Sequence, residues 1–524
     1  MSQNAKLEFR PGKLNSVSLE QVCKAFDEKV SLQTGGDLSV IVTGLSLSSD
    51  NAISGDLFLA FQGQRFHGLD YLKVAQEKGI VAILTDQTGA KKLAELPDAL
   101  ELPVLVLKSG SDPRGFVAEI SNWFYQFPSS DLRVVGVTGT NGKTTTTYLI
   151  EELLKAGHRK TALLGTIELH LGEQTIESPR TTVEAPVLQA FLATCKEQNV
   201  SDVVVEISSH AIALKRVAGL TLDLAVFTNL QRDHLDFHGT MENYFEDKAK
   251  IFAPEYSKKA VICVDDSWGQ KLAARYSDAQ SVATQRDSAG WEQATWKVTD
   301  QQIGLGSLGS HFVLNGPDQI KLECYVPFPG EVNIINSALA IVNANTAGVA
   351  LETAVAALKV VRPIPGRMEV VTNRTETLPG IIVDYAHTPD ALALALKSIR
   401  PITPGRIIIV FGSDGDRDQG KRPIMGKISA ELADILVVTD ENPRYEDADS
   451  IRSAIIDGVR SSRPQLTNVF EISPRAKAIA HAISLADSGD TIIITGKGHE
   501  PYQEIQGIMH RYNDRDVVKA ILNS

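Results

Sequence analysis

The chain has 524 residues, of which 43% are hydrophobic and 22% charged, as is typical of a globular protein with several buried cores. Its formal net charge of −12 argues against non-specific binding to nucleic acid or to an anionic membrane, and we expect neither partner. Four cysteines without a C-x-x-C pair argue against a zinc centre or a disulfide framework. The N-terminus has no apolar leader and no apolar run reaches about 18 residues, so we expect a cytoplasmic protein.

Three consecutive units are predicted along the chain. In residues 1–130, short apolar runs such as DLFLAF, IVAILTD and LPVLVLK alternate with helical stretches, which indicates a small α/β domain. Residues 131–366 contain the continuous β-branched runs of a buried parallel sheet, such as VVGVTG and DVVVEIS. Between Asp278 and Leu322 the pattern becomes polar and alternating, which predicts antiparallel strands or an elaboration of the domain.

The third unit, residues 367–524, follows the hinge-like segment VVRPIPGRMEV. Its strands GIIVDYAH, RIIIVFG, ILVVTDEN and TIIITGKG, with helices between them, predict a doubly wound, Rossmann-like sheet. The expected fold is therefore an α/β protein of three domains, with a P-loop-type domain in the centre.

The stretch GTNGKTT starts where an apolar strand gives way to an apolar helix. Gly139 and Gly142 would allow backbone N–H groups to surround a phosphate, Lys143 would reach its terminal oxygens, and Thr144 would hold Mg²⁺. The standard motif G-x-x-x-x-G-K-[ST] has a glycine at the position that Val137 occupies in this sequence. The residues predict a nucleotide-binding site. They leave open whether the nucleotide is ATP or GTP, and whether its phosphate is hydrolysed or transferred.

Polar side chains follow the next strands. Glu206, at the carboxyl end of a strand, is placed to bind Mg²⁺, although a helix cap or a surface carboxylate is the alternative. A later loop contains Asp233, His234, Asp236 and His238, for which a Mg²⁺ or polyphosphate role fits better than zinc, and a solvated loop is the alternative. Lys248, on a predicted helix, reads from the residues alone as a surface lysine.

Three polar loops follow strands of the third unit. They contain Arg417, Arg444 and the pair Lys497 and Glu500, and they should converge at one edge of the sheet. Arginine binds carboxylates through its guanidinium fork, and Glu500 could meet an ammonium group. The loops predict a ligand with both a carboxylate and an amine, such as an amino acid.

Over nearly the whole chain the sequence resembles the Mur ligase family, and within it the UDP-N-acetylmuramoyl-tripeptide synthetases. The resemblance is carried by these motifs, in this order: GTNGKTT, EISSH, TNLQRDHLDFHG, YFEDK, PGRMEV, GDRDQGKRP, ENPR and GKGHEPYQ. The resemblance implies domains for the UDP-substrate, ATP and an amino acid. It implies that ATP phosphorylates the C-terminal carboxylate of UDP-MurNAc-L-Ala-D-Glu and that an amine attacks the acyl phosphate. ATP and Mg²⁺ are the implied cofactors, both substrates are small molecules, and we expect a monomer.

The resemblance also implies roles for individual residues. Lys143, Glu206, His234 and Lys248 would be catalytic, with Lys248 carbamylated, and Thr144, Glu206, His234 and Lys248 would hold the metal. The residues expected to bind ATP are Gly139, Thr140, Asn141, Gly142, Lys143, Thr144, Thr145, Asn333 and Arg367. The residues expected to bind the UDP-substrate are Leu47, Ser49, Thr181, Thr182, Ser208 and Arg216. The residues expected to bind the amino acid are Arg417, Glu441, Asn442, Pro443, Arg444, Gly496 and Glu500.

The sequence departs from the family pattern at three places. Ser48-Ser49-Asp50 replaces the signature D-S-R, which makes the uridine contacts the least secure; Glu441 replaces aspartate in D-N-P-R; and Leu214 replaces a glutamine of some relatives. Arg444 and Asn442 would suit the distal carboxylate of meso-diaminopimelate, so we favour it over L-lysine, although Glu441 could face an ammonium group. The alternatives are a folylpolyglutamate-synthetase-like ligase and a non-enzymatic scaffold.

Overall fold

The computed structural model describes residues 9–13, 16–33, 37–63, 66–95, 102–304 and 309–523. Residues 1–8 lie outside these ranges. They belong to the N-terminal stretch in which the sequence predicts no apolar leader. The chain divides into two compact units: one within Met1–Gly139, His158–Val226 and Arg232–Ala260, the other within Thr140–Gly157, Phe227–Gln231 and Val261–Ser524. Within the described ranges, no helix is both long and apolar enough to cross a membrane.

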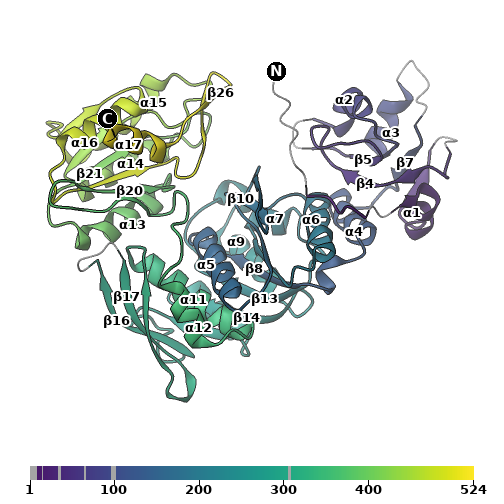
Figure 1. The fold of residues 1–524 in the computed structure, drawn as a ribbon. Helices are drawn as coiled ribbons and strands as arrows, with labels where there is room; N and C mark the ends of the chain where they lie inside the picture. The colour runs from purple at the N-terminus through teal and green to yellow at the C-terminus, as the bar shows by residue number, and fades with distance from the viewer. Residues whose placement is uncertain are drawn as a thin grey trace. The chain divides into compact units, whose positions relative to one another are not determined.

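The N-terminal part folds around a five-stranded sheet of order β2-β7-β6-β5-β4, parallel except for β2 (Figure 1). Alternate strand residues face opposite sides. Leu57 and Leu59 pack with α1 and α4, whereas Phe58 and Ala60 pack with α2. The elements of this part are β1 (Val17–Ser18), α1 (Leu19–Ala25), β2 (Val30–Leu32), β3 (Ile41–Val42), β4 (Gly44–Ser46), β5 (Asp56–Ala60), α2 (Leu72–Glu77), β6 (Ala82–Thr85), α3 (Gln87–Ala94), β7 (Val104–Leu107) and α4 (Pro113–Phe124).

The central sheet has the strand order β11-β10-β9-β12-β8-β13-β14-β15-β16-β17-β18. Strand β12 runs parallel to both β9 and β8, and Val204 pairs with Leu163 and Val135. All five residues of β12 are buried, which explains the continuous apolar run in the sequence. The strands are β8 (Arg133–Thr138), β9 (Thr161–Leu164), β10 (Glu168–Leu171), β11 (Gln174–Glu177), β12 (Asp202–Glu206), β13 (Leu222–Phe227), β14 (Ser257–Cys263), β15 (Gln280–Ala283), β16 (Trp296–Ile303), β17 (Ser310–Asn315) and β18 (Lys321–Val326).

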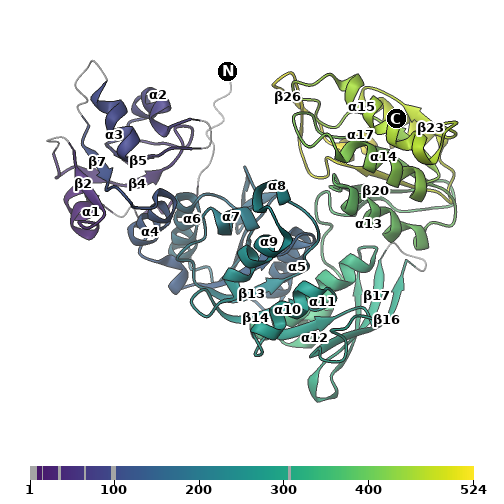
Figure 2. The ribbon, with the colours of Figure 1, turned by 180° about the vertical axis from the view of Figure 1, so that it is seen from behind.

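The polar alternating stretch after Asp278 forms antiparallel strands, as predicted. Strand β17 pairs antiparallel with β16 and β18 (β16 and β17 are labelled in Figures 1 and 2). The first strand of the stretch, β15, differs from the prediction because it runs parallel to β14 and β16. The helices of the central region are α5 (Lys143–Ala156), α6 (Ala185–Glu197), α7 (Ser209–Ala213), α8 (Leu235–His238), α9 (Met241–Ala249), α10 (Ser267–Arg275), α11 (Glu331–Thr346) and α12 (Leu351–Leu358).

The C-terminal sheet has the order β19-β20-β24-β21-β22-β23, and only β19 is antiparallel. Its strands are buried on both faces. Ile407 and Ile409 pack with α13 and α14, and Ile408 and Val410 pack with α16 and α17. The elements are β19 (Glu369–Thr372), β20 (Gly380–Asp384), α13 (Pro389–Ile399), β21 (Ile407–Phe411), α14 (Lys421–Leu432), β22 (Ile435–Val438), α15 (Ala448–Ser462), β23 (Val469–Glu471), α16 (Arg475–Leu485), β24 (Thr491–Thr495), β25 (Tyr502–Ile505), β26 (Ile508–Arg511) and α17 (Asp514–Leu522).

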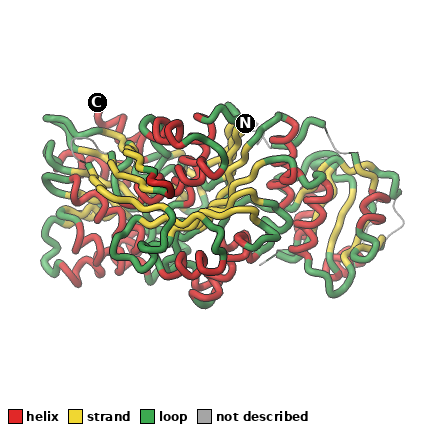
Figure 3. The backbone as a smooth tube through the Cα atoms, turned by 90° about the horizontal axis from the view of Figure 1, so that it is seen from below, coloured by secondary structure: helices red, strands yellow, loops and turns green. Residues whose placement is uncertain are grey.

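These three sheets, with helices on their faces (Figure 3), confirm the predicted three-domain α/β fold. The domain boundaries at 130/131 and 366/367 stay a prediction. All four cysteines are described and free, as expected. Burial raises the pKa of Cys324 to about 12, so this thiol is inert.

Candidate active site

The glycine-rich loop joins the end of β8 to the start of α5, as the sequence predicts. Gly139 and Gly142 have φ angles of 150° and 87°, which glycine adopts without steric cost. A Cβ atom at Gly142 would lie 2.4 Å from Oδ1 of Asn336, so the turn has no room for a side chain. The first N–H groups of a helix have no partner within it, and here they directly follow the loop. This arrangement suits a phosphate group.

The segment after β13 holds the loop in place. The N–H of Asn141 donates to Oδ1 of Asn229 across 3.0 Å, and the Thr228 hydroxyl donates to the carbonyl oxygen of Asn141 across 2.6 Å. Lys143 folds back, and its Nζ donates to the carbonyl oxygen of Thr140 across 2.8 Å. These hydrogen bonds fix the course of the loop between β8 and α5.

Two residues expected on the nucleotide side have different surroundings. Nη2 of Arg367 donates to Oγ1 of Thr144 across 3.1 Å, and its guanidinium lies 4.5 Å from the ring centroid of Tyr385. Asn333 is buried on α11 and donates from Nδ2 to the carbonyl oxygen of Pro329. Arg367 is thus hydrogen-bonded to Thr144, whereas the side-chain amide of Asn333 is hydrogen-bonded to the residue that precedes its own helix by two positions.

Glu206 is neither a helix cap nor a surface carboxylate. It is completely buried at the end of β12, where Oε1 accepts from the N–H of Thr166 at 3.1 Å and Oε2 accepts from its hydroxyl at 2.8 Å. The Thr166 hydroxyl also contacts that of Thr181, and Thr182 donates to the Glu206 carbonyl oxygen and accepts from the N–H of Ser208. A hydroxyl network therefore joins the expected metal carboxylate to three of the expected substrate residues.

Lys248 is not a surface residue, which corrects the reading from its helix pattern alone. On α9 it is only 1% exposed. Its Nζ donates to the carbonyl oxygen of Gly139 across 2.8 Å, contacts Oγ1 of Thr138 at 3.5 Å and lies 4.8 Å from the ring centroid of Tyr244. A buried ammonium group needs such partners to offset its desolvation. The lysine thus lies directly at the first residue of the glycine-rich loop.

Aromatic and histidine rings gather beside α7. The ring centroid of His210 lies 4.7 Å from that of His234 and 5.4 Å from that of His238. Burial, followed by the nearby His234, lowers the pKa of His210 to about 4, so this ring is neutral near pH 7. His238 is buried, with Nδ1 2.8 Å from Asp247 and Nε2 3.0 Å from Ser209. No trio of His, Cys, Asp or Glu in the described ranges is arranged to hold a metal ion.

A cavity of about 490 Å³ lies at the end of the N-terminal sheet. Leu47, Ser49 and Arg216 line it, so the structure brings together three of the expected UDP-substrate residues; Thr181, Thr182 and Ser208 are not among its lining residues. Arg114 and Lys215 also line the cavity, and their positive charges suit a diphosphate. The sequence signal that could have identified Arg114 is its position in the first turn of α4, where anions bind favourably.

The loops after β21, β22 and β24 converge, as predicted. The N–H of Gly415 donates to the carbonyl oxygen of Asn442 across 2.8 Å, and Nζ of Lys497 donates to its Oδ1 across 2.9 Å. Pro443 is buried in the middle loop. Arg417 lies exposed and forms no ion pair with another residue of the described ranges, so the structure does not join it to this group.

Acidic and basic side chains contact one another where these loops meet, in a group that we call the C-terminal charge cluster. Glu500 is bound by Nζ of Lys497 at 3.0 Å and by Nδ2 of Asn442 at 3.1 Å. Arg444 lies between two carboxylates, with Nη2 3.5 Å from Asp414 and Nε 3.4 Å from Glu504. The predictions from sequence missed Asp414 and Glu504, because nothing in their local pattern marks them as partners of Arg444.

Glu441 is almost completely buried beside Gly496, whose φ angle is 107°. A Cβ atom at position 496 would lie 2.5 Å from Oε2 of Glu441, so the larger acid occupies the space that glycine leaves. Burial, followed by the charge of Asp414, raises the pKa of Glu441 to about 8.

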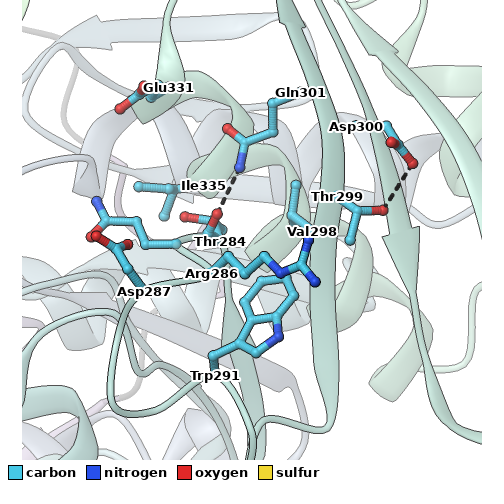
Figure 4. A pocket seen from close by; sticks show the side chains of 11 residues that line it. Thr284, Arg286, Asp287, Trp291, Val298, Thr299, Asp300, Gln301, Glu331 and Ile335 are labelled. Carbon is cyan, nitrogen blue, oxygen red and sulfur yellow. Dashed lines mark hydrogen bonds between the residues drawn. The ribbon is translucent and has the colours of Figure 1, made fainter.

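A separate cavity of about 420 Å³ lies beside β15 and β16 (Figure 4). Its lining includes Arg286, Trp291 and Glu331, and Gln301 donates to the carbonyl oxygen of Thr284. None of the residues expected to bind a substrate lines it.

Comparison with known proteins identifies two family domains in the chain. Residues 137–344 match the Mur ligase middle domain and residues 366–498 match the Mur ligase, glutamate ligase domain. The chain belongs to the Mur ligase family.

Several similar proteins, among them the two described next, are named UDP-N-acetylmuramoyl-L-alanyl-D-glutamate–2,6-diaminopimelate ligase. The chain is 40% identical to that of Streptomyces avermitilis over 92% of both chains, and 39% identical to that of Corynebacterium glutamicum over 96% of both chains. A solved ligase of the same name aligns with a TM-score of 0.63 and 28% identity, over 97% of this chain and 99% of the other. A Mycobacterium tuberculosis folylpolyglutamate synthase aligns with a TM-score of 0.58 and 21% identity over 73% of this chain, a likeness of fold.

Proposed function

We propose that this chain is an ATP-dependent ligase that joins meso-diaminopimelate to UDP-N-acetylmuramoyl-L-alanyl-D-glutamate, a step of peptidoglycan precursor synthesis. The observation that carries the proposal is the 40% identity, over 92% of both chains, with a relative named for this reaction. Because both substrates would be nucleotide-linked or free small molecules of the cell interior, we assign the enzyme to the cytoplasm.

The reaction must first activate a carboxylate, which is a poor electrophile. Transfer of the terminal phosphoryl group of ATP to this carboxylate gives an acyl phosphate and ADP. The amine then attacks the acyl carbon, and the tetrahedral intermediate collapses to an amide as phosphate leaves. In this proposal the loop Gly139–Gly142 and Lys143 hold the phosphates of ATP and stabilise the charge that moves with the phosphoryl group.

The residues around Glu206 fit Mg²⁺, because a buried carboxylate supported by hydroxyl groups supplies the oxygen ligands that this ion prefers. We assign Thr144, Glu206, His234 and Lys248 to it. The ammonium group of Lys248 would repel a cation, so this assignment requires carbamylation, which gives the side chain a negative charge. Bound Mg²⁺ would neutralise the developing charge on the transferring phosphoryl group.

We assign the cavity of the N-terminal domain to the UDP portion of the substrate. Arg114, Lys215 and Arg216 contribute three positive charges to its lining, although Lys215 also pairs with Asp112 at 2.7 Å. The hydroxyls of Thr181, Thr182 and Ser208 belong to the network of Glu206 and would orient the peptide carboxylate toward the phosphate loop.

The test is release of ADP by the purified full chain with ATP, Mg²⁺ and UDP-MurNAc-L-Ala-D-Glu, with and without meso-diaminopimelate. We expect release only when both substrates are present, together with a tripeptide product. L-lysine and a folate acceptor serve as competing substrates. A preference for L-lysine would overturn the assigned amino acid, and release with folate alone would overturn the assigned reaction.

A further inference from the structure

Arg367 carries a positive charge that no carboxylate of the described ranges takes up through a hydrogen bond. Its Nη2 donates to Oγ1 of Thr144 across 3.1 Å, and its Nε is buried without a hydrogen-bond partner among the described residues. Asp384 interacts with this charge, but its Oδ2 accepts from the N–H of Met368 at 2.7 Å and its Oδ1 accepts from the N–H of Ala386 at 2.9 Å. The guanidinium therefore keeps its charge for an anion beside the first turn of α5.

The backbone on both sides of Arg367 is fixed by two acids. The N–H of Gly366 donates to Oε2 of Glu369 across 2.7 Å, and the N–H of Met368 donates to Asp384. These bonds set the position of the Cα atom of Arg367 and leave the angles of its long side chain free. Because fixing such a side chain costs rotamer entropy, a further contact has to hold the guanidinium in place.

The ring of Tyr385 supplies that contact. The guanidinium carbon of Arg367 lies 4.5 Å from the ring centroid, within the range of a cation–π interaction. The ring is itself packed, because its centroid lies 4.7 Å from that of His387 and 5.2 Å from that of His499. Burial raises the pKa of the Tyr385 hydroxyl above its ordinary value, so the ring is uncharged at neutral pH. Tyr385 thus offers a fixed, neutral aromatic face directly after β20.

Contact through an aromatic face leaves the N–H groups of the guanidinium available. The guanidinium is planar and its donors lie in its plane, so a ring on one face does not use them. Nη2 can donate to Thr144 while the ring of Tyr385 holds the group. A carboxylate in place of the ring would occupy the same donors and neutralise the charge that attracts a phosphate.

We propose that Tyr385 is a positioning residue for the nucleotide: its ring holds the guanidinium of Arg367 beside Thr144, where the guanidinium binds the phosphates of ATP. This assignment rests on the proposed function and adds a residue that is not among those implied by the resemblance. Tyr385 acts through Arg367 and does not touch the reacting atoms. A guanidinium that is already in place loses less entropy when ATP binds, so removal of the ring should weaken nucleotide binding.

Titration calorimetry of the full chain with Mg²⁺ and AMPPNP, an ATP analogue that is not hydrolysed, tests this role. We expect Tyr385→Leu to raise the Kd for AMPPNP about 3–30-fold, because a cation–π contact shielded from water is lost. Tyr385→Phe keeps the ring and should change this Kd less than about twofold. The Kd for UDP-MurNAc-L-Ala-D-Glu should stay within about twofold in both variants. The control is Phe470→Leu, which removes another ring of the C-terminal domain, one that packs on His481 at 4.7 Å, and it should leave the Kd for AMPPNP unchanged.

A second substitution separates positioning from general packing. In a chain that carries Arg367→Ala, the ring has no guanidinium to hold, so the addition of Tyr385→Leu should change the Kd for AMPPNP less than about twofold. A loss as large as in the wild-type background would show that the ring supports the fold, and it would overturn the proposal. An unchanged Kd in Tyr385→Leu alone, or a Tyr385→Phe variant that binds as weakly as Tyr385→Leu, would also overturn it.

Failure of the proposed function is seen separately. A wild-type chain that binds no AMPPNP would refute ATP as the nucleotide, and the role of Tyr385 with it. A wild-type chain that binds AMPPNP but forms no product from meso-diaminopimelate would refute the proposed reaction. Because calorimetry measures nucleotide binding and not turnover, the comparison of the Tyr385 variants would still decide the role of the ring.

Discussion

Lys248 donates a hydrogen bond from Nζ to the carbonyl oxygen of Gly139, across 2.8 Å. This bond joins the last turn of α9 to the first residue of the glycine-rich loop. The same ammonium group lies over the ring of Tyr244 and is removed from solvent. A lysine in this position can influence both the shape of the loop and the charge near a bound phosphate.

Replacement of Lys248 by alanine should therefore lower kcat by at least about 100-fold, since it removes a charged group beside the loop that we propose holds the phosphates of ATP. Steady-state ADP release would measure this, and mass spectrometry of the native protein with and without bicarbonate would test for a bound carbon dioxide. The control is Lys250→Ala, because Lys250 is 53% exposed and its one ion pair within the described part of the chain is with Asp247. Full activity in the Lys248 variant would contradict its assigned role.

Arg216→Ala should raise the KM for the UDP-substrate about tenfold or more and leave the KM for ATP unchanged, because Arg216 lines the N-terminal cavity. Its neighbour Arg180 pairs with the same carboxylate, Glu184, but does not line the cavity. Arg180→Ala is therefore the matched control and should have wild-type constants. A similar rise in KM for both variants would mean that Glu184, rather than the substrate, explains the effect.

A stability prediction concerns the buried ion pair of Arg475 and Asp514. Both side chains are 0% exposed, so Asp514→Asn would leave an uncompensated charge in the interior. We expect a loss of about 3–5 kcal/mol, seen as a lower urea midpoint by circular dichroism. Asp516→Asn changes a 70% exposed acid in the first turn of the same helix and should cost no more than about 1 kcal/mol. Equal midpoints for the two variants would refute this account.

Glu441 predicts a pH dependence of stability. Burial and Asp414 raise its pKa from 4.5 in the unfolded chain to about 8 in the folded one. The folded chain therefore keeps a proton that the unfolded chain releases, and this contribution to the free energy of unfolding falls as the pH rises from about 4.5 to 8. The slope should be at most about 1.4 kcal/mol per pH unit.

Glu441→Gln removes this titrating group. The urea midpoint of the variant should therefore change less between pH 5 and pH 8 than that of the wild type. This pH window lies between the unfolded and folded pKa values of Glu441. Asp457→Asn, which leaves the buried acid in place, should follow the wild-type pH profile. Parallel profiles for wild type and Glu441→Gln would show that Glu441 does not carry the shifted proton.

The sequence predicts features that depend on local periodicity. The continuous apolar runs of β12 and β21, and the glycine-rich turn before α5, lie where the pattern puts them. Lys248 shows the limit of reasoning from local sequence. Nothing in YFEDK distinguishes a helix lysine that faces solvent from one that faces the interior. Only the motif resemblance marked it, and its burial depends on packing between α9 and the end of β8.

The same limit applies to the charged residues of the C-terminal charge cluster. The sequence predicts that Glu500 meets an ammonium group, and the structure supplies one from Lys497, three residues earlier. That pairing could not be read from the motif GKGHEP, because the loop conformation determines whether two nearby charges face each other or a ligand. Asp414 and Glu504 are distant in sequence from Arg444, so their convergence is a property of the topology.

Strand β25 fixes the backbone on both sides of Arg444: the N–H of Arg444 donates to the carbonyl oxygen of Glu504 across 3.0 Å, and its own carbonyl oxygen accepts from the N–H of Gln506 across 2.7 Å. The conformation at this position, with a φ angle of 54°, is thus held by main-chain bonds as well as by the contacts of the guanidinium with Asp414 and Glu504. Because β-branched and bulky side chains are strained at a positive φ angle, only a restricted set of residues could replace Arg444 without moving the loop. The backbone of this loop therefore limits which variants of position 444 report on the side chain alone.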